Sequence, residues 1–259
     1  MQEKHYEVII IGGGITGSAL AYVLAEFSGI ENIALLEKYE GLATLNSKAS
    51  ANSQTIHCGD IETNYDLQKA TEVKRKADMI VKYCQKHGYE NKFLFQGQKM
   101  ALGVGESEVE LIKERFEKFK ELYPYLQLFD KEELKKIEPK LVFDGRGEER
   151  AEDIVAMGVQ SGVYTTIDYG AMANSFVQNA KNVDGKTCDL YLNTEVQNIT
   201  KVGDKLYIRT ANRLSLSADF VVVDAGAHSL WLAHKMGLGQ DLSTICIAGS
   251  FYLTKQKLL

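Results

Sequence analysis

The alternation of apolar and polar positions near the N-terminus predicts a β-α-β unit. Residues 6–11 (YEVIII) are β-branched and closed by glycine, which predicts a short, fully buried strand. Small residues followed by apolar ones over 15–28 predict a helix, and IALLE at residues 33–37 predicts a second buried strand. The unit has the length of about thirty residues that a crossover between parallel strands requires.

Beyond this unit the periodicity stops and then returns with helical spacing. Residues 41–66 are rich in Ser, Asn, Thr, Ala and Gly and predict a loop. Residues 67–87 and 106–122 have the spacing of amphipathic helices. The apolar face of the first is formed by Val73, Ala77, Ile80 and Cys84. Within 130–153 we expect a short helix stopped by Pro139 and a loop, and we interpret the many charges as solvated faces.

An α/β pattern resumes in the C-terminal part of the chain. Asp168 is placed to cap a helix over 169–182. Apolar runs predict strands at 158–166 (GVQSGVYTT), 188–193, 195–211 (a strand and hairpin around Gly-Asp), 217–226 and 244–255, with a short helix near 228–236.

Three glycines between the first strand and the first helix indicate a dinucleotide site. Gly12, Gly14 and Gly17 form G-x-G-x-x-G in the strand-to-helix context that this fingerprint requires. The first glycine permits the tight turn, the second lets backbone approach a pyrophosphate, and the third lets helix and strand pack closely. Glu37 ends the second strand 20 residues past Gly17, where a carboxylate can accept hydrogen bonds from ribose hydroxyls and disfavours a 2′-phosphate.

The long interruption after the β-α-β unit favours FAD over NAD. A nicotinamide domain continues with closely spaced β-α repeats, whereas here loop and helix intervene until about residue 158. Such a break is typical of a sheet interrupted by pieces of a substrate domain. The interruption contains KASANSQTIHCGD at residues 48–60, whose small donors and acceptors, Ser53 and Thr55 among them, could follow a ribityl chain to a flavin ring. An ordinary polar connection is the alternative interpretation of this loop.

Several stretches together resemble a known family. They are the glycine motif, the loop NSQTIHCG, TTIDYGAMANSFV at 165–177, NTEV at 193–196 and VVVDAGAHSLWLAHKMG at 221–237. They resemble the FAD-dependent oxidoreductases related to D-amino-acid oxidase, and within that group most of all the malate:quinone oxidoreductases. The resemblance extends from residue 6 to about residue 254.

The resemblance implies FAD as cofactor and a set of residues that bind it. The glycine motif would hold the pyrophosphate, Glu37 the adenosine ribose, the backbone of Val196 the adenine, and residues 53–57 the flavin side. The residues expected to bind FAD are Gly12, Gly14, Ile15, Thr16, Gly17, Glu37, Lys38, Ser53, Gln54, Thr55, His57, Val196, Ala225 and Gly226. The segment 53–56 departs from the pattern of the family, which is rich in glycine there.

The implied fold is α/β: a Rossmann-like, three-layer FAD-binding parallel sheet with an interleaved α+β substrate domain, truncated at the C-terminus. We expect the FAD-binding domain over 1–66 and 155–237, and a partial helical or substrate domain over 67–154 and 238–259. Because members of the family continue for many more residues, we expect the catalytic base and the groups that bind the substrate carboxylate beyond residue 259.

No residue of this chain is therefore assigned a catalytic role. His57 could orient a substrate or hydrogen-bond the flavin, with a structural role as the alternative, and His228 is expected to cap or pack the last helix. The arginines lie mainly in charged, surface-like stretches and offer no clamp for a dicarboxylate: Arg75, Arg115, Arg146, Arg150, Arg209 and Arg213.

The implied reaction is oxidation of a 2-hydroxy acid, with malate favoured, by hydride transfer to the flavin, after which electrons pass to a quinone. Fold similarity does not fix the substrate. L-2-hydroxyglutarate, glycerol 3-phosphate and amino acids stay open as alternative substrates. A non-catalytic FAD-binding fragment and an NAD-dependent dehydrogenase are the alternative classes.

Composition narrows the partners and the location. A net charge of −5 argues against nucleic acid as a partner. The 4 cysteines show no C-x-x-C spacing, which fits reduced thiols and no metal site. The sequence has no apolar run long enough to span a membrane and no secretory signal, so we expect a cytoplasmic protein. Peripheral contact with the cytoplasmic face of the inner membrane rests on the implied quinone alone, and the oligomeric state is not indicated.

Overall fold

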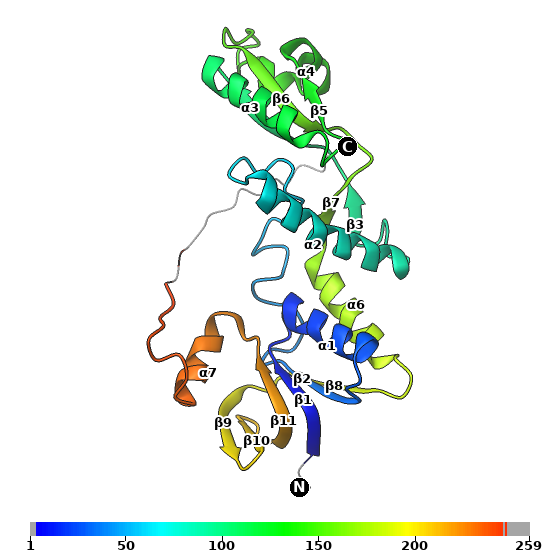
Figure 1. Ribbon diagram of the computed structural model, residues 1–259, viewed down its shortest axis with the longest axis vertical. Helices are drawn as coiled ribbons and strands as arrows, with labels where there is room; N and C mark the ends of the chain where they lie inside the picture. The colour runs from blue at the N-terminus through cyan, green and yellow to red at the C-terminus, as the bar shows by residue number, and fades with distance from the viewer. Residues whose placement is uncertain (1–3, 246, 248–259) are drawn as a thin grey trace. The chain divides into compact units, whose positions relative to one another are not determined.

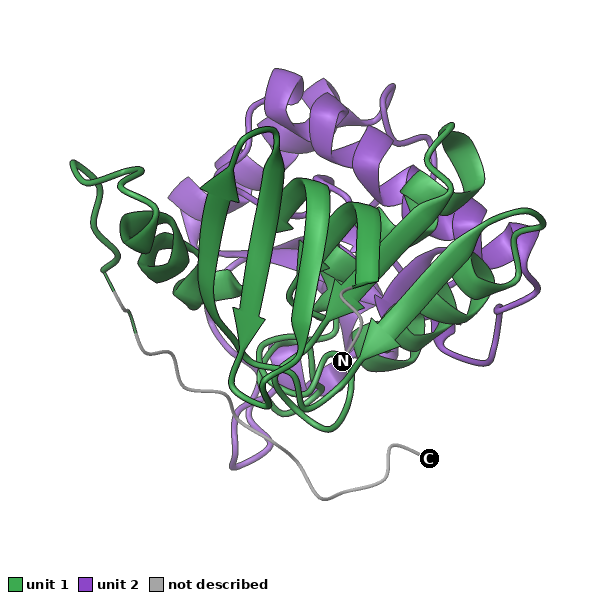
Figure 2. Ribbon diagram, turned by 90° about the horizontal axis from the view of Figure 1, so that it is seen from below, with its two compact units in different colours: residues 1–54, 168–259 green, residues 55–167 purple. Residues whose placement is uncertain are grey.

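The computed structural model describes residues 4–245 and 247 of the chain, and these form two compact units. Unit 1 contains the chain up to Gln54 and again from Asp168, and unit 2 is the segment Thr55–Ile167 (Figure 2). The chain thus leaves unit 1 once and returns once. The sequence predicts an FAD-binding domain over 1–66 and 155–237 and a partial helical or substrate domain over 67–154 and 238–259. This assignment of functions to ranges stays a prediction.

Unit 1 is built on a six-stranded sheet with the order β8-β2-β1-β11-β10-β9 (Figure 1). Its strands are β1 (Lys4–Ile11), β2 (Asn32–Leu36), β8 (Thr187–Tyr191), β9 (Val196–Val202), β10 (Lys205–Thr210) and β11 (Ser215–Val223). The first four in spatial order are parallel, and β10 and β9 continue the sheet antiparallel. Val8 of β1 pairs with Ile33 on one side and Phe220 on the other. The predicted α/β fold with a parallel sheet is confirmed.

Two helices pack against each other and against the parallel strands of unit 1. They are α1 (Ile15–Phe27) and α6 (Tyr169–Lys181), whose aromatic rings Tyr22 and Phe176 meet with centroids 5.6 Å apart. The side chain of Asp168 accepts a hydrogen bond from Ala171 N–H at 2.9 Å, so the predicted cap of α6 is confirmed. Ile9 and Ile10 of β1 are completely buried, as expected for a central strand of a parallel sheet.

After β11, unit 1 continues with a 3-10 turn η1 (Gly226–His228) and a short helix α7 (Ser229–Lys235), which packs Leu232 into the core beside β9 and β11. The hairpin predicted around Gly-Asp is present, and Gly203 takes a φ of +63° in its turn. The strand predicted over 244–255 falls mainly outside the described residues.

Unit 2 contains two small antiparallel sheets and four helices. The sheets pair β3 (Leu94–Gln96) with β7 (Tyr164–Ile167), and β4 (Lys99–Val104) and β5 (Gln127–Phe129) with the central strand β6 (Ile154–Val159). The helices are α2 (Leu67–Lys86), α3 (Glu106–Phe119), α4 (Lys131–Ile137) and α5 (Pro139–Val142). The helices predicted over 67–87 and 106–122 are confirmed.

Two details of unit 2 correct the sequence interpretation. The stretch GVQSGVYTT is not one strand: β6 ends at Val159, and Gly162, with a φ of +83°, turns the chain before β7 begins. Pro139 follows the end of α4 as expected, but it also occupies the first turn of α5, where its missing N–H is harmless.

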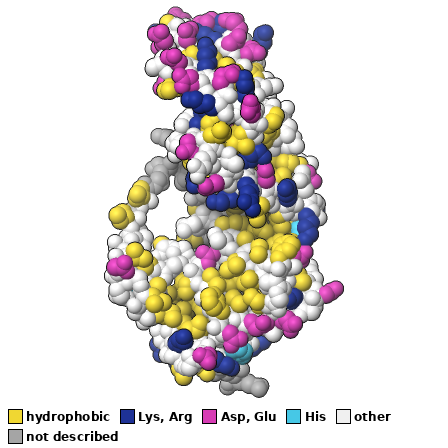
Figure 3. All heavy atoms as spheres, viewed as in Figure 1, with side chains coloured by type: hydrophobic (Ala, Val, Ile, Leu, Met, Phe, Trp, Pro, Cys, Tyr) yellow, Lys and Arg dark blue, Asp and Glu magenta, His cyan; other side chains and the backbone are white. Residues whose placement is uncertain are grey.

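The surface of unit 2 agrees with the expected solvated helix faces. Lys, Arg, Asp and Glu side chains are interspersed over α3 and α4 (Figure 3). Within α2, Ala77 and Cys84 are buried, as the predicted apolar face requires. No helix in the described part of the chain is long and apolar enough to cross a membrane.

Candidate functional site

A pocket of unit 1 lies at the carboxyl ends of β1, β2 and β11, the edge at which open α/β sheets bind their ligands. It encloses about 440 Å³, within the range typical of small-molecule sites. Its lining comes from the glycine turn and the start of α1, the end of β2, the loop 43–52, the start of β9, and the 224–232 segment. All of these belong to unit 1.

At two glycines of the motif after β1, Gly12 and Gly17, no other residue could be placed without displacement of backbone. Gly12 has a φ of +117°, and a Cβ atom there would lie 2.1 Å from the carbonyl oxygen of Asp224. A Cβ atom at Gly17 would lie 2.0 Å from the carbonyl oxygen of Gly12. The turn and the first turn of α1 therefore pack with backbone against backbone.

Gly14 differs from these two glycines because it faces open space. The nearest atom to a Cβ added there is Ser47 Oγ, at 3.8 Å. Gly14 is the residue that precedes α1 and makes no side-chain cap, and no acidic residue lies in the first turn of the helix. The start of α1 thus presents backbone N–H groups and the positive end of the helix dipole to the pocket. One of them, Ile15 N–H, donates to Ser47 Oγ at 3.2 Å.

Glu37 connects the end of β2 to the glycine turn. Its Oε2 accepts a hydrogen bond from Gly13 N–H at 2.7 Å, and its Oε1 accepts one from Tyr39 N–H at 2.9 Å. The residue is only 8% exposed, yet it lines the pocket. Each carboxylate oxygen can accept a second bond, so the group can still receive ligand hydroxyls.

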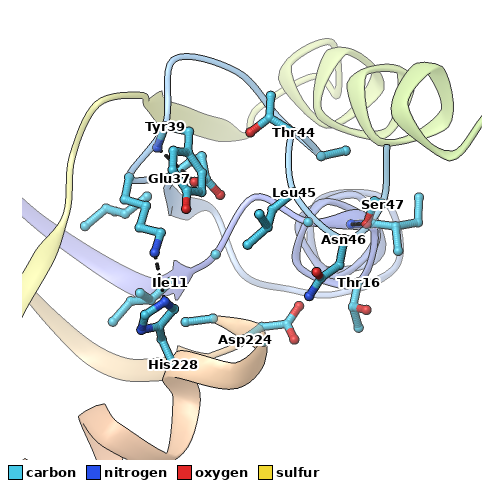
Figure 4. A pocket seen from close by; sticks show the side chains of 18 of the residues that line it. Ile11, Thr16, Glu37, Tyr39, Thr44, Leu45, Asn46, Ser47, Asp224 and His228 are labelled. Atoms are coloured by element: carbon cyan, nitrogen blue, oxygen red, sulfur yellow. Dashed lines mark hydrogen bonds between the residues drawn. The ribbon is translucent and has the colours of Figure 1, made fainter. Parts of the chain in front are cut away.

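Lys38 and His228 meet at the same pocket from two separate segments. Lys38 Nζ lies 3.0 Å from His228 Nε2 and 4.9 Å from the ring centroid of Tyr39 (Figure 4). His228 is the N-cap residue of α7, but its side chain makes no capping hydrogen bond, so the expectation that it caps or packs the last helix is met only in its position.

The turn after β11 brings a carboxyl group beside the glycines. Asp224 N–H donates to the carbonyl of Ile11 at 2.8 Å, which continues the pairing of β11 with β1. Burial raises the pKa of the Asp224 carboxyl. In Figure 4 this carboxyl group and the amide of Asn46 point toward one another.

The loop between β2 and unit 2 is held by the side chain of Gln54. Its Oε1 accepts a hydrogen bond from Tyr169 N–H at 2.9 Å, and its Nε2 donates to Asn52 Oδ1 at 2.6 Å and to the carbonyl of Ser47 at 3.3 Å. Gln54 has a φ of +54°, a conformation that favours glycine. The bonds made by its side chain hold the loop in this conformation.

This chemistry fits the ADP half of FAD. The space at Gly14 and the N–H groups of α1 suit a diphosphate, and the buried carboxylate of Glu37 suits ribose hydroxyls. Val196, at the start of β9, is buried and lines the same pocket, where an adenine ring would find an apolar contact.

Comparison with known families decides the classification. The family model described as malate:quinone oxidoreductase matches residues 4–259 of the chain. The chain belongs to the malate:quinone oxidoreductase family.

Curated relatives from this family are longer than the chain. A probable malate:quinone oxidoreductase of Campylobacter jejuni is 53% identical over 261 aligned positions, which cover 100% of this chain and 58% of the relative. One from Helicobacter pylori strain P12 is 39% identical and covers 95% of this chain and 54% of the relative. The chain thus spans a little more than half the length of these malate:quinone oxidoreductases.

Solved structures show the same fold at low sequence identity. Glycine oxidase from Geobacillus kaustophilus superposes with a TM-score of 0.69 at 19% identity, covering 91% of this chain and 59% of that one. L-alpha-glycerophosphate oxidase from Mycoplasma pneumoniae, a structure described as having FAD bound, superposes with a TM-score of 0.63 at 24% identity, covering 90% and 57%.

The structure brings most of the residues expected to bind FAD into one pocket. Those that line it are Gly12, Gly14, Ile15, Thr16, Glu37, Lys38, Val196, Ala225 and Gly226. Gly17 lies behind the turn, packed against Gly12. Ser53 and Gln54 belong to unit 1 but do not line the pocket, and Gln54 acts on the loop through Ser47 and Tyr169.

Thr55 and His57 belong to unit 2, whereas the other residues expected to bind FAD belong to unit 1. Thr55 forms an isolated antiparallel β-bridge with Thr166 of β7. His57 Nδ1 lies 2.9 Å from Glu62 Oε1, and its side chain is 61% exposed. The flavin-side role of these two residues stays a proposal.

Several lining residues were not predicted from the sequence. They are Ile11, Leu36, Tyr39, Ala43, Thr44, Leu45, Asn46, Ser47, Asn52, Tyr169, Thr194, Glu195, Asp224, Trp231 and Leu232, together with His228, which was given another role. The sequence did contain a signal for Asp224, because an acidic residue directly after a buried parallel strand lies at the edge of the sheet where ligands bind.

Arg115 is the exception among the arginines, which were expected mainly in charged, surface-like stretches. It donates to the carbonyls of Tyr65 and Glu62, at 2.7 Å each, and lies 3.9 Å from the ring centroid of Phe119. Its guanidinium is therefore occupied in holding the structure of unit 2.

Proposed function

We propose that the pocket of unit 1 binds the ADP half of FAD, within an enzyme that oxidises a 2-hydroxy acid, malate by preference, and passes the electrons to a quinone. The observation that carries the proposal is the convergence of Gly14, Glu37 and the 224–226 turn on one pocket of the required size. Membership of the malate:quinone oxidoreductase family supports malate and a quinone as the reacting partners.

Each part of the pocket has a distinct task in this proposal. The first turn of α1, with Gly14, Ile15 and Thr16, receives the diphosphate through backbone N–H groups, and Gly12 and Gly17 let that turn form. Glu37 accepts hydrogen bonds from the adenosine ribose, which also disfavours a 2′-phosphate beside a carboxylate. When bound, FAD accepts the hydride of the substrate, which no amino-acid side chain can do.

Other residues complete the site. Lys38 and His228 border the ribose side, Val196 borders the adenine, and Ala225 and Gly226 pass beside the cofactor. Ser53, Gln54, Thr55 and His57 are proposed for the ribityl and flavin side. A quinone acceptor would require peripheral contact of the protein with the cytoplasmic face of the membrane. We propose this contact from family membership alone.

The test is a spectroscopic titration of the purified chain. After incubation with FAD and gel filtration, the protein fraction is expected to carry the flavin absorption bands. Anaerobic addition of malate should bleach them, and a quinone should restore them, with L-2-hydroxyglutarate and glycerol 3-phosphate as substrate controls. Because the catalytic base is expected beyond residue 259, the malate step is also run on a chain of the full length of the relatives, and retention of FAD there without bleaching by malate would overturn the proposed reaction. A folded chain that never retains FAD would overturn the proposal as a whole.

A further inference from the structure

Asp224 places a carboxyl group against the first turn of α1. Its backbone is fixed beside the last residue of β1 by the bond from Asp224 N–H to the carbonyl of Ile11. Its Oδ2 lies 3.1 Å from the position that a Cβ on Gly17 would take, and the side chain lines the pocket. The carboxyl group therefore adjoins the turn at which the proposed function places a diphosphate.

This carboxyl group has no ionic or hydrogen-bonding partner among the residues that the structure describes. Burial alone raises its pKa, with no charged neighbour contributing. Its neighbour on the facing loop is the neutral amide of Asn46, and the first turn of α1 carries no acid (Figure 4). The other titratable groups that line the pocket are Glu37, Lys38 and Tyr39 at β2, Tyr169 at α6, Glu195 at β9, and His228 before α7.

A diphosphate at this turn carries two negative charges. It repels an ionised Asp224 carboxylate strongly, because water screens charges only weakly at a partly buried site. We propose that Asp224 takes up one proton from solvent when a diphosphate binds at the glycine turn, so that cofactor binding is coupled to protonation of this residue. The proton bonds to a carboxylate oxygen, and no other bond is formed or broken. The neutral carboxyl can then donate its O–H to a phosphate oxygen, which an ionised carboxylate cannot do.

The inference rests on the proposed function, and its test can fail separately. Isothermal titration calorimetry with FAD and with ADP-ribose is run between mildly acidic and mildly alkaline pH, in pairs of buffers with different ionisation enthalpies. Both ligands lack a phosphomonoester, so their diphosphate does not titrate in this range. The buffer dependence of the heat counts the protons taken up. We expect uptake approaching one proton, and an affinity that falls by up to about tenfold for each pH unit.

Asp224→Asn is the decisive variant because asparagine has the same shape, donates an N–H and carries no charge at any pH. It is expected to bind both ligands without proton uptake, and about tenfold or more tightly than the wild type at the alkaline end. Glu195→Gln is the matched control, since Glu195 is an exposed carboxylate that lines the same pocket, and it should keep the wild-type proton uptake.

Three results would overturn the inference. The first is binding of FAD and ADP-ribose to the wild type with no proton uptake, a measurement that needs no variant. The second is proton uptake that survives in Asp224→Asn but is lost in His228→Asn, which would assign the proton to His228. The third is a failure of both ligands to bind at every pH, which also overturns the proposed function, whereas the first two leave that function standing.

Discussion

Glu37 Oε2 accepts a hydrogen bond from Gly13 N–H at 2.7 Å, and this bond joins the end of β2 to the turn that follows β1. The second oxygen of the same carboxylate accepts Tyr39 N–H at 2.9 Å. Glu37 therefore shapes the glycine turn before any ligand is considered. A residue expected only to contact a ribose is also part of the structure that forms the pocket.

Glu37→Gln should lower both stability and ligand affinity. The amide has only one oxygen, so one of the two backbone N–H groups loses its acceptor, which costs about 1–3 kcal/mol when the donor is buried. We expect the free energy of unfolding in urea to fall by that amount, and the affinity for ADP-ribose to fall by about tenfold or more. Glu195→Gln, at an exposed position, serves as control. Unchanged stability and affinity in Glu37→Gln would contradict this role.

The glycines of the motif should separate into structural and ligand-contacting positions. Gly17→Ala places a Cβ atom 2.0 Å from the carbonyl oxygen of Gly12, so backbone must move, and we expect a loss of about 1–3 kcal/mol in the free energy of unfolding. Gly14→Ala meets its nearest atom only at 3.8 Å and should unfold within about 1 kcal/mol of the wild type. Because the added methyl group enters the proposed diphosphate position, Gly14→Ala should still lose FAD binding. Equal destabilisation by the two variants would contradict the distinction.

Unit 2 contains a buried ion pair whose separation should be costly. Lys99 Nζ lies 2.6 Å from Asp60 Oδ2, with side chains 8% and 1% exposed, and Tyr125 O–H donates to the same oxygen at 2.7 Å. Lys99→Met leaves the carboxylate buried without its cation, and we expect the free energy of unfolding to fall by about 3–5 kcal/mol.

The double variant Lys99→Met/Asp60→Asn removes both charges and should recover a large part of that loss. The matched control is Lys118→Met, which breaks an exposed pair with Glu114 and should change the free energy of unfolding by less than about 1 kcal/mol. Urea denaturation is measured for the wild type, Lys99→Met, Asp60→Asn, the double variant and the control Lys118→Met. Additive losses in the double variant would show that the two side chains do not act as a pair.

How much of this could be read from the sequence depends on how local the signal is. The β-α-β unit was predicted because β1 and β2 are continuous apolar runs and the glycine motif lies between them. Strands β3 and β5 were missed because each has only three residues and is stabilised by antiparallel partners distant in sequence.

The same reasoning applies to the site. The glycines and Glu37 were predicted because their spacing along the chain is fixed by one motif. Asp224 was missed because its place beside the glycine turn depends on the pairing of β11 with β1, which joins residues more than two hundred positions apart. Gln54 was expected to lie near the cofactor, but the sequence gives no sign that its side chain binds Ser47, Asn52 and Tyr169.

Buried thiols should make the chain less stable at alkaline pH. Burial raises the pKa of Cys84 to about 11 and that of Cys188 to about 11. In the unfolded chain a thiol ionises near its ordinary value of about 8.5. Between these two values the unfolded state loses protons that the folded state keeps, so the free energy of unfolding falls as pH rises, by up to about 1.4 kcal/mol per pH unit for each thiol.

The contribution is isolated by a difference measurement. The stability difference between the wild type and Cys84→Ala/Cys188→Ala, measured by urea denaturation, should shrink as pH rises from about 8 to about 10.5. Groups elsewhere in the chain titrate equally in both proteins and cancel. A difference that stays constant over this range would show that the two thiols do not titrate differently on folding.

The central claim is that the pocket of unit 1 binds FAD through its ADP half, and equilibrium competition tests it most directly. The wild-type chain and Gly14→Ala are titrated with FAD, followed by flavin fluorescence, with ADP-ribose as competitor and riboflavin as the ligand that lacks the ADP half. The account predicts saturable FAD binding to the wild type, displacement by ADP-ribose, no competition by riboflavin, and loss of binding in a Gly14→Ala protein of normal stability. FAD binding that neither ADP-ribose nor Gly14→Ala diminishes, or no FAD binding at all by the folded wild type, would contradict it.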